Sequence, residues 1–244
     1  MANWSDPRSN AATRPTSVGA EAAAFDAGLR SYMLSVYNYM ASGVLLTGII
    51  ALLFSQSAAA PAILFGPGIL KYIIMFSPLA FVMVLSFGIT RLSTGAAQAI
   101  FWAFAAVMGL SLSSIFFVYT GTSIAQTFFA TAAAFAGLSL YGYTTKRDLS
   151  AFGTFLVMGV VGLVVAMLIN MFIQSSALQL VISFVGVLLF AGLTAYDTQR
   201  IKSLYFQVAG TDMMGKTVVM GALSLYLDFI NMFTFLLQFM GDRR

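Results

Sequence analysis

Two acidic residues lie inside apolar stretches of the sequence, where a charged group is energetically costly. Asp197 stands in Gly192-Leu-Thr-Ala-Tyr-Asp-Thr-Gln199, and Asp228 stands in Ser224-Leu-Tyr-Leu-Asp-Phe-Ile-Asn-Met-Phe233. A carboxylate near the centre of a membrane helix costs about 2.5–3.5 kcal/mol on insertion scales, so an intramembrane acid indicates a functional site. Adjacent carboxylates in a low dielectric cannot both ionise cheaply and would share one proton. If Asp197 and Asp228 meet, the pair is therefore a pH sensor.

The same pair favours a hard cation. Once deprotonated, two carboxylates offer four oxygens between them, which suit Ca²⁺ better than a soft metal. We therefore assign Asp197 and Asp228 as pH-sensing and Ca²⁺-binding residues. Two other interpretations stay open. In one, Asp228 has a purely structural, hydrogen-bonded role; in the other, Asp197 is a solvated residue at the membrane surface that pairs with Arg200.

Several kinds of catalytic chemistry are excluded because the chain contains neither cysteine nor histidine. Disulfides, thiolate metal sites, His-zinc sites and Ser-His catalysis are therefore ruled out. The segment Gly210-Thr-Asp-Met-Met-Gly-Lys-Thr217 matches the phosphate-loop pattern. A working phosphate loop follows a strand in an α/β domain, whereas this segment connects two apolar stretches. We expect no enzyme activity and no tightly bound cofactor.

The elements that must position the two aspartates are membrane-spanning helices. Of the 244 residues, 60% are hydrophobic and 8% are charged, against roughly 25% charged residues in soluble domains. A helix needs about 20 apolar residues to cross a bilayer. The predicted fold class is therefore an all-α integral membrane protein with seven transmembrane helices. The apolar stretches place the spans at about 32–56, 72–90, 97–118, 123–143, 152–173, 177–199 and 217–240.

The chain divides into a short tail and one membrane domain. Residues 1–25 are rich in Ala, Ser, Thr and Asn and lack the apolar core of a signal peptide, so we predict a disordered cytoplasmic tail. Asp26 is the predicted N-cap of the first helix, and residues 26–244 form the seven-helix transmembrane domain. Small residues let membrane helices approach closely. We expect this role for Gly153, Gly159, Gly162, Gly186 and Gly192.

The basic residues orient the bundle. With seven spans, one side carries the tail and the loops after the second, fourth and sixth spans. That side holds Arg8, Arg14, Arg30, Arg91, Lys146, Arg147, Arg200, Lys202 and Lys216, whereas the other side holds Lys71, Arg243 and Arg244. Because cytoplasmic loops carry the excess of Lys and Arg, the N-terminus is predicted to be cytoplasmic. A re-entrant last segment, which would move Arg243 and Arg244 to the majority side, is the alternative.

Sequence spacing alone does not bring the two aspartates together. If the sixth and seventh spans start level at the membrane surface, Asp228 lies deeper than Asp197 by roughly 10 Å, at 1.5 Å per residue. A contact then requires the sixth span to be displaced inward, tilted or kinked, with Gly192 as the candidate for a kink.

Two segments carry a resemblance to a known family. Ala191-Gly-Leu-Thr-Ala-Tyr-Asp-Thr-Gln-Arg-Ile-Lys202 and Ala222-Leu-Ser-Leu-Tyr-Leu-Asp-Phe-Ile-Asn-Met-Phe233 resemble the Bax inhibitor-1 family (the transmembrane Bax-inhibitor-motif family) in its bacterial members. The resemblance extends over nearly the whole chain after residue 25. It implies six helices that surround a central, hydrophobic seventh helix in the bacterial inner membrane.

The resemblance also implies an activity and roles for three residues. The implied activity is a pH-sensitive Ca²⁺ leak, with Asp197 and Asp228 as the pH sensor. In the family, an arginine on the second helix is thought to latch the closed state by pairing with the aspartate of the sixth helix. Arg91, at the end of the second span, is the candidate latch in this chain.

Three functions compete at this point. The first is a pH-sensitive Ca²⁺ leak channel gated by a proton-sharing aspartate pair, with Ca²⁺ as the permeant ion. The alternative is a membrane-integral regulator that binds a membrane-bound AAA protease through the tail, without transport activity. The third is a proton-coupled transporter. The expected partners are the lipid bilayer, Ca²⁺, protons and, in the alternative, the protease. The sequence has no basic patch, so we do not expect nucleic acid as a partner.

Overall fold

The computed structural model describes residues 17–244, and the regular elements within this range are helices. They are α1 (Ser17–Ser55), α2 (Ala60–Phe65), α3 (Leu70–Gly88), α4 (Thr94–Leu112), α5 (Ile115–Val118), α6 (Gly121–Thr144), α7 (Ser150–Ile173), α8 (Ser176–Val208) and α9 (Met213–Met240). Within this range seven helical stretches are long and apolar enough to cross a membrane, with α4 and α5 together forming the span Thr94–Val118. The predicted all-α, seven-span fold class is confirmed.

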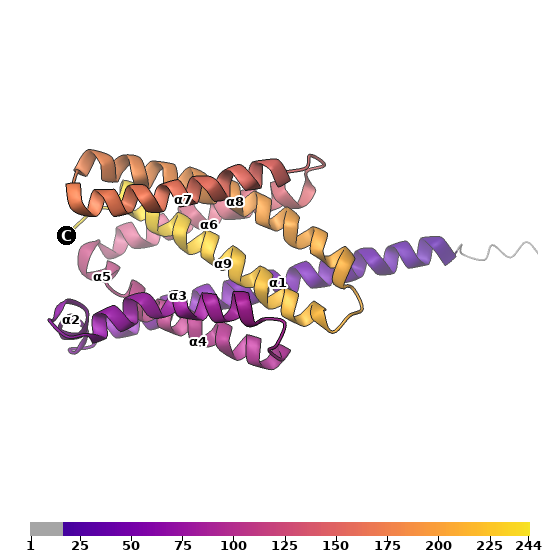
Figure 1. Ribbon diagram of the computed structural model, residues 1–244, viewed down its shortest axis with the longest axis horizontal. Coiled ribbons are helices and arrows are strands. Elements are labelled where there is room, and N and C mark those ends of the chain that lie inside the picture. Colours follow the sequence, from indigo (N-terminus) through magenta and orange to yellow (C-terminus); the bar gives the residue numbers. More distant parts are fainter. Residues whose placement is uncertain (1–16) are drawn as a thin grey trace, which may run out of the picture.

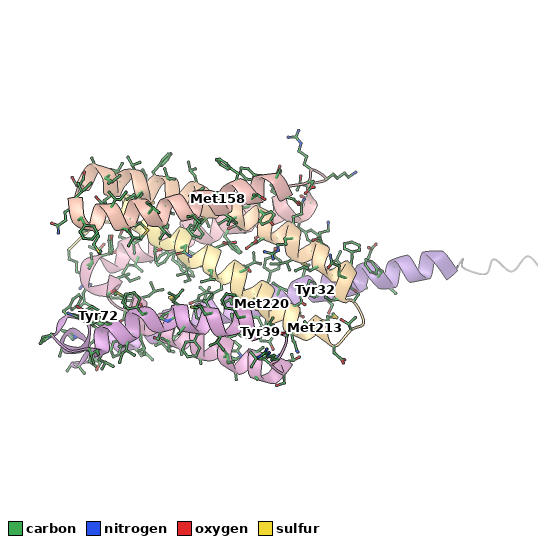
Figure 2. All side chains as sticks on the ribbon, viewed as in Figure 1. Tyr32, Tyr39, Tyr72, Met158, Met213 and Met220 are labelled. Carbon is green, nitrogen blue, oxygen red and sulfur yellow. The ribbon has the colours of Figure 1, made fainter. Side chains whose placement is uncertain are left out.

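The outer surface of the bundle suits an apolar solvent. Phe87 on α3 and Phe172 on α7 are each 81% exposed, and Figure 2 shows mainly carbon along the flanks of the bundle. Water would make so large an apolar surface unstable, whereas the hydrocarbon chains of a bilayer accept it. The exposed faces of these helices therefore lie against lipid.

The first helix begins earlier than predicted. α1 starts at Ser17, so the prediction that Asp26 caps it is wrong, and the boundary predicted after residue 25 falls inside the helix. The reason is local, because Ala20-Glu-Ala-Ala-Ala24 consists of strong helix formers. The rest of the predicted tail, residues 1–16, lies outside the part of the chain that the structure describes.

The sixth span is longer than predicted. α8 continues to Val208, so Arg200 and Lys202, which were expected in a loop, are helical. Arg and Lys favour helices, and their long side chains can carry the charge to water while the helix continues. The chain turns only at Gly210, whose φ of 74° favours glycine. Asp197 therefore lies well inside α8 rather than near its end.

Helix α9 is the most buried element of the bundle. In Figure 1 it runs diagonally between α6, α7 and α8 on one side and α1, α3 and α4 on the other. In its most apolar stretch 72% of the residues are buried, against 11–39% in the other six spans. It packs against α8, α1, α6 and α4, whereas α3 packs mainly on α4 and α7 on α8. The arrangement of six helices around the seventh therefore stays a prediction.

The last helix crosses the whole bundle. α9 is continuous over 28 residues, about 42 Å at 1.5 Å per residue, which exceeds the roughly 30 Å hydrocarbon core. Tyr72 at the start of α3 and Met213 at the start of α9 lie at opposite ends of the bundle (Figure 2). The C-terminus likewise lies at the end opposite the one from which α1 projects (Figure 1). These positions favour a spanning last helix over the re-entrant alternative, while the cytoplasmic N-terminus stays a prediction.

Close packing between helices rests on four of the five expected glycines. A Cβ atom at any of these four would fall inside a neighbouring side chain: Gly153 against Tyr196, Gly159 against Leu189, Gly186 against Phe235 and Gly192 against Leu156. Gly162 has no atom within 4 Å of that position, so the packing prediction is wrong there.

Candidate functional site

Asp228 lies in the core of the bundle, near the middle of α9. Its side chain is buried, with 4% of its surface exposed. Among the described residues, its Oδ2 atom has no hydrogen-bond partner. The residues around it on α9 are largely apolar and buried, including Leu225, Phe229 and Met232. A buried polar atom without a partner is rare in a native protein and calls for an explanation, such as a functional role for the group.

Asp197 lies on the neighbouring helix, on the face that points toward α9. Ile201 of α8 packs against Gly221 of α9, and Asp197 is one helical turn before Ile201 on the same face. This places Asp197 level with about residue 225 of α9, roughly 4–5 Å along the axis from Asp228. The two carboxylates are close enough to act on each other electrostatically.

The sequence predicted an axial offset between Asp197 and Asp228 because it placed the end of the sixth span shortly after Asp197. Because α8 runs to Val208 and α9 starts at Met213, the connection is short and both aspartates lie well inside their helices. The offset of roughly 10 Å falls to about half, and the kink at Gly192 within α8 (Ser176–Val208) stays a prediction. The structure thus brings together the two residues that the sequence singled out.

The guanidinium of Arg200 attracts the carboxylate of Asp197 electrostatically. Arg91 is exposed in the turn after α3. Within residues 17–244 no ion pair joins Arg91 to Asp197, and the carbonyl of its neighbour Thr90 lies 3.4 Å from the Nζ atom of Lys216. The alternative in which Asp197 is a solvated residue that pairs with Arg200 therefore stays a prediction, and so does the Arg91 latch.

Polar contacts that the sequence did not indicate surround the pair. The hydroxyl oxygens of Thr47 on α1 and Tyr226 on α9 lie 2.6 Å apart. Thr198, the residue after Asp197, donates to Ser139 of α6 across 3.4 Å. Thr, Ser and Tyr are frequent in membrane helices, so their pairing is visible only once the helices are packed.

A polar network also links the other end of α7, α8 and α9. The amide of Asn170 donates to Gln179 across 3.1 Å, and the amide of Gln179 donates to Gln238 across 2.7 Å. These amides satisfy each other where three helices meet. The isolated Asn170, Gln179 and Gln238 in apolar stretches were the signal for this network in the sequence.

The capacity of the site for metal is small. In the described part of the chain no group of three or more Asp, Glu, His or Cys side chains gathers in an arrangement that could hold a metal ion. The aspartate pair alone supplies four oxygens, whereas Ca²⁺ takes six to eight oxygen ligands. The pair therefore fits an ion that keeps part of its water better than a resident metal.

The phosphate-loop match has no structural support. Residues 209–212 form the turn between α8 and α9, and Gly215, Lys216 and Thr217 are in the first turns of α9. The segment follows a helix rather than a strand, so it lacks the α/β setting in which such a loop binds phosphate.

Comparison with known proteins gives a consistent result along the chain. A sequence model of the family described as "Inhibitor of apoptosis-promoting Bax1" matches residues 29–244. The inner membrane protein YbhL of Escherichia coli K12 is 47% identical over 220 residues, which cover 89% of this chain and 94% of YbhL. The uncharacterized protein RP147 of Rickettsia prowazekii is 47% identical over 221 residues, covering 90% and 93%. An uncharacterized protein of Caulobacter vibrioides is 45% identical over 228 residues, covering 90% and 91%.

Proposed function

The chain belongs to the Bax inhibitor-1 family, and from this premise we propose that it is a pH-sensitive Ca²⁺ leak channel gated by a proton-sharing aspartate pair. It is a multi-pass protein of the membrane, and its similarity to YbhL supports the bacterial inner membrane as its location. The observation that carries the proposal is the position of Asp197 and Asp228 on facing sides of α8 and α9, with one buried oxygen of Asp228 unpartnered.

Proton sharing follows from the surroundings of the pair. Two charged carboxylates in a low dielectric repel each other strongly, so the pair holds one proton between them. Uptake of a second proton removes the remaining charge, and loss of the shared proton doubles it. Either change alters the attraction of the pair for Arg200 and for Arg91, and with it the balance between closed and open states.

Ca²⁺ is the permeant ion in this proposal. Carboxylate oxygens are hard ligands that Ca²⁺ prefers. A pair that supplies four of the six to eight ligands binds the ion weakly enough for it to leave. Conduction requires that balance between entry and release.

The test is Ca²⁺ flux into proteoliposomes across a pH series. We expect the wild type to leak faster than empty vesicles, with a steep dependence on pH. Asp228→Asn and Asp197→Asn should each abolish that dependence, because each variant retains only one of the two carboxylates that share the proton. Asp212→Asn, which changes an exposed acid between α8 and α9, should retain the wild-type profile.

Two results contradict the proposal. One is Ca²⁺ entry no faster than in empty vesicles at every pH, and the other is an unchanged pH profile in Asp228→Asn. The first result would turn attention to the protease-regulator alternative. That alternative is tested by deletion of residues 1–16, the part of the predicted tail that precedes α1.

A further inference from the structure

A long apolar groove opens between α1 and α6. Its volume is about 730 Å³, and Phe229 of α9 contributes to its lining. α1 packs mainly on α4 and α9, and α6 on α8 and α9, rather than on each other, so the groove is open toward the surrounding lipid. A second cavity of about 270 Å³ continues it and shares Val44, Phe128 and Phe229 with it.

One face of α1 forms a wall along both cavities. The face carries residues at helical spacing: Arg30, Met33, Tyr37, Met40, Val44, Thr47 and Ala51. From Arg30 to Ala51 the helix rises about 32 Å, close to the roughly 30 Å hydrocarbon core of a bilayer. The groove itself is lined by α1 from Arg30 to Leu45, a rise of about 22 Å. One lipid chain fills about half of the roughly 30 Å hydrocarbon core, so the groove is long enough for an acyl chain and longer than a small solute needs.

The charge of the groove is confined to one end. Arg30, at the end nearest the N-terminus, is the charged residue in its lining. A second cation lies beside that end, since the Nζ atom of Lys202 donates to the carbonyl of Tyr143 across 2.8 Å, and Tyr143 lines the groove. The nearest acid along α1 is Asp26, one turn away, and within the described residues Asp26 and Arg30 form no ion pair.

Apolar lining alone does not select an occupant in a membrane. Lipid tails are as apolar as the groove, so burial of a chain there gains little free energy. Selection must come from the end where Arg30 and Lys202 meet the headgroup region, and cations at that depth attract anionic headgroups. We propose that the groove between α1 and α6 is a binding site for one phospholipid with an anionic headgroup, its phosphate at Arg30 and one acyl chain along α1.

In this arrangement the lipid chain contacts the part of α9 that carries Asp228. Phe229 lines both cavities and directly follows Asp228. Phe128 and Phe135 of α6 pack on Phe229, each with ring centroids 5.5 Å away. The occupant of the groove thus contacts the helical turn that holds Asp228.

The experiment is native mass spectrometry of the purified full chain with equal amounts of phosphatidylglycerol and phosphatidylcholine. The readout is bound lipid and requires no Ca²⁺ flux. We expect one tightly bound phosphatidylglycerol in the wild type. One basic residue near the surface changes the affinity for anionic lipid about fivefold. Arg30→Gln should therefore lower the preference for phosphatidylglycerol about fivefold, and Arg30→Lys should keep most of it.

Matched controls separate the groove from general surface charge. Arg91→Gln removes a charge from the turn after α3, outside the groove, and should keep the preference. Ala136→Trp fills the groove and should lose the bound lipid, whereas Ala134→Trp, at an exposed position on α6 outside the lining, should retain it. Equal binding of both lipids by the wild type, an unchanged preference in Arg30→Gln, or a retained lipid in Ala136→Trp would each overturn the proposal.

Discussion

Thr47 of α1 and Tyr226 of α9 share a buried hydrogen bond of 2.6 Å between their hydroxyl oxygens. Thr47 also donates to the carbonyl of Ala105 in α4 across 2.8 Å. A hydroxyl has one proton to donate, so Tyr226 is the donor and Thr47 the acceptor in the bond between them. Two side chains thereby join α1, α4 and α9, half a turn from Asp228.

Substitution of Thr47 should cost more stability than substitution of Tyr226. Tyr226→Phe removes one donor, and hydrogen bonds between membrane helices contribute about 0.6 kcal/mol on average. Thr47→Val leaves the Tyr226 hydroxyl buried without a partner, which costs about 1–3 kcal/mol. Thermal unfolding in detergent measures both, and the double variant should lose less than the two single losses combined. Equal losses that add would show that the bond contributes nothing.

Two glycines on α6 give a matched test of helix packing. A Cβ at Gly142 would collide with the backbone carbonyl of Ala195 on α8, whereas a Cβ at Gly137 meets no atom within 4 Å. Gly142→Ala should force α6 and α8 apart and lower stability by about 1–3 kcal/mol. Gly137→Ala should be neutral or stabilising by up to about 1 kcal/mol, because alanine favours the helix. Equal melting temperatures for the two variants would contradict the packing.

Asp148, outside the membrane spans, links stability to pH at the start of α7. The hydroxyl and the backbone N–H of Ser150 lower the pKa of Asp148 below its ordinary value of 3.8, and the N–H donates to Oδ1 across 2.9 Å. A lowered folded pKa stabilises the protein above the unfolded pKa, and this stabilisation is lost as pH falls through the folded pKa. Asp148→Asn should therefore lower the melting temperature at neutral pH, and this difference should disappear as the pH falls through the lowered pKa of folded Asp148. A difference that persists in acid would exclude this cause.

Ca²⁺ flux through variants of Arg91 and Arg200 should show which arginine holds the closed state. If Arg91 holds the closed state by pairing with Asp197, Arg91→Gln should raise Ca²⁺ flux severalfold where the pair is charged, and Arg91→Lys should raise it less. Arg200 is the cation that acts on Asp197 in this structure. A larger effect of Arg200→Gln in the same flux series would assign the latch to Arg200 instead.

The spans and the two aspartates were predictable because a membrane imposes strong rules on sequence. A stretch of about 20 apolar residues has few structures available in lipid, and a carboxylate within it stands out. The length of α8 was not predictable, because Arg200 and Lys202 resemble a loop in composition although they continue the helix. That extension decides whether Asp197 and Asp228 meet.

Features that depend on how helices pack were not visible in the sequence. Thr47, Ser139 and Thr198 are ordinary residues of apolar stretches, and only their neighbours show that they form hydrogen bonds. The groove between α1 and α6 arises because α1 packs mainly on α4 and α9, and α6 on α8 and α9, instead of on each other. No local pattern in either helix specifies that separation.

The burial of α9 has a consequence for how the protein is made. The helix with the largest buried share follows the other six spans along the chain, so it is synthesised after them. Until it is in place, the hydroxyl of Thr47 lacks its contact with Tyr226, and Gly186 of α8 lacks the Phe235 ring that packs against it. We therefore expect the first six spans to pack loosely against one another until α9 inserts between them. The final residues then fasten the helix in place, since the N–H of Arg244 donates to the carbonyl of Val118 and the N–H of Thr120 to that of Asp242.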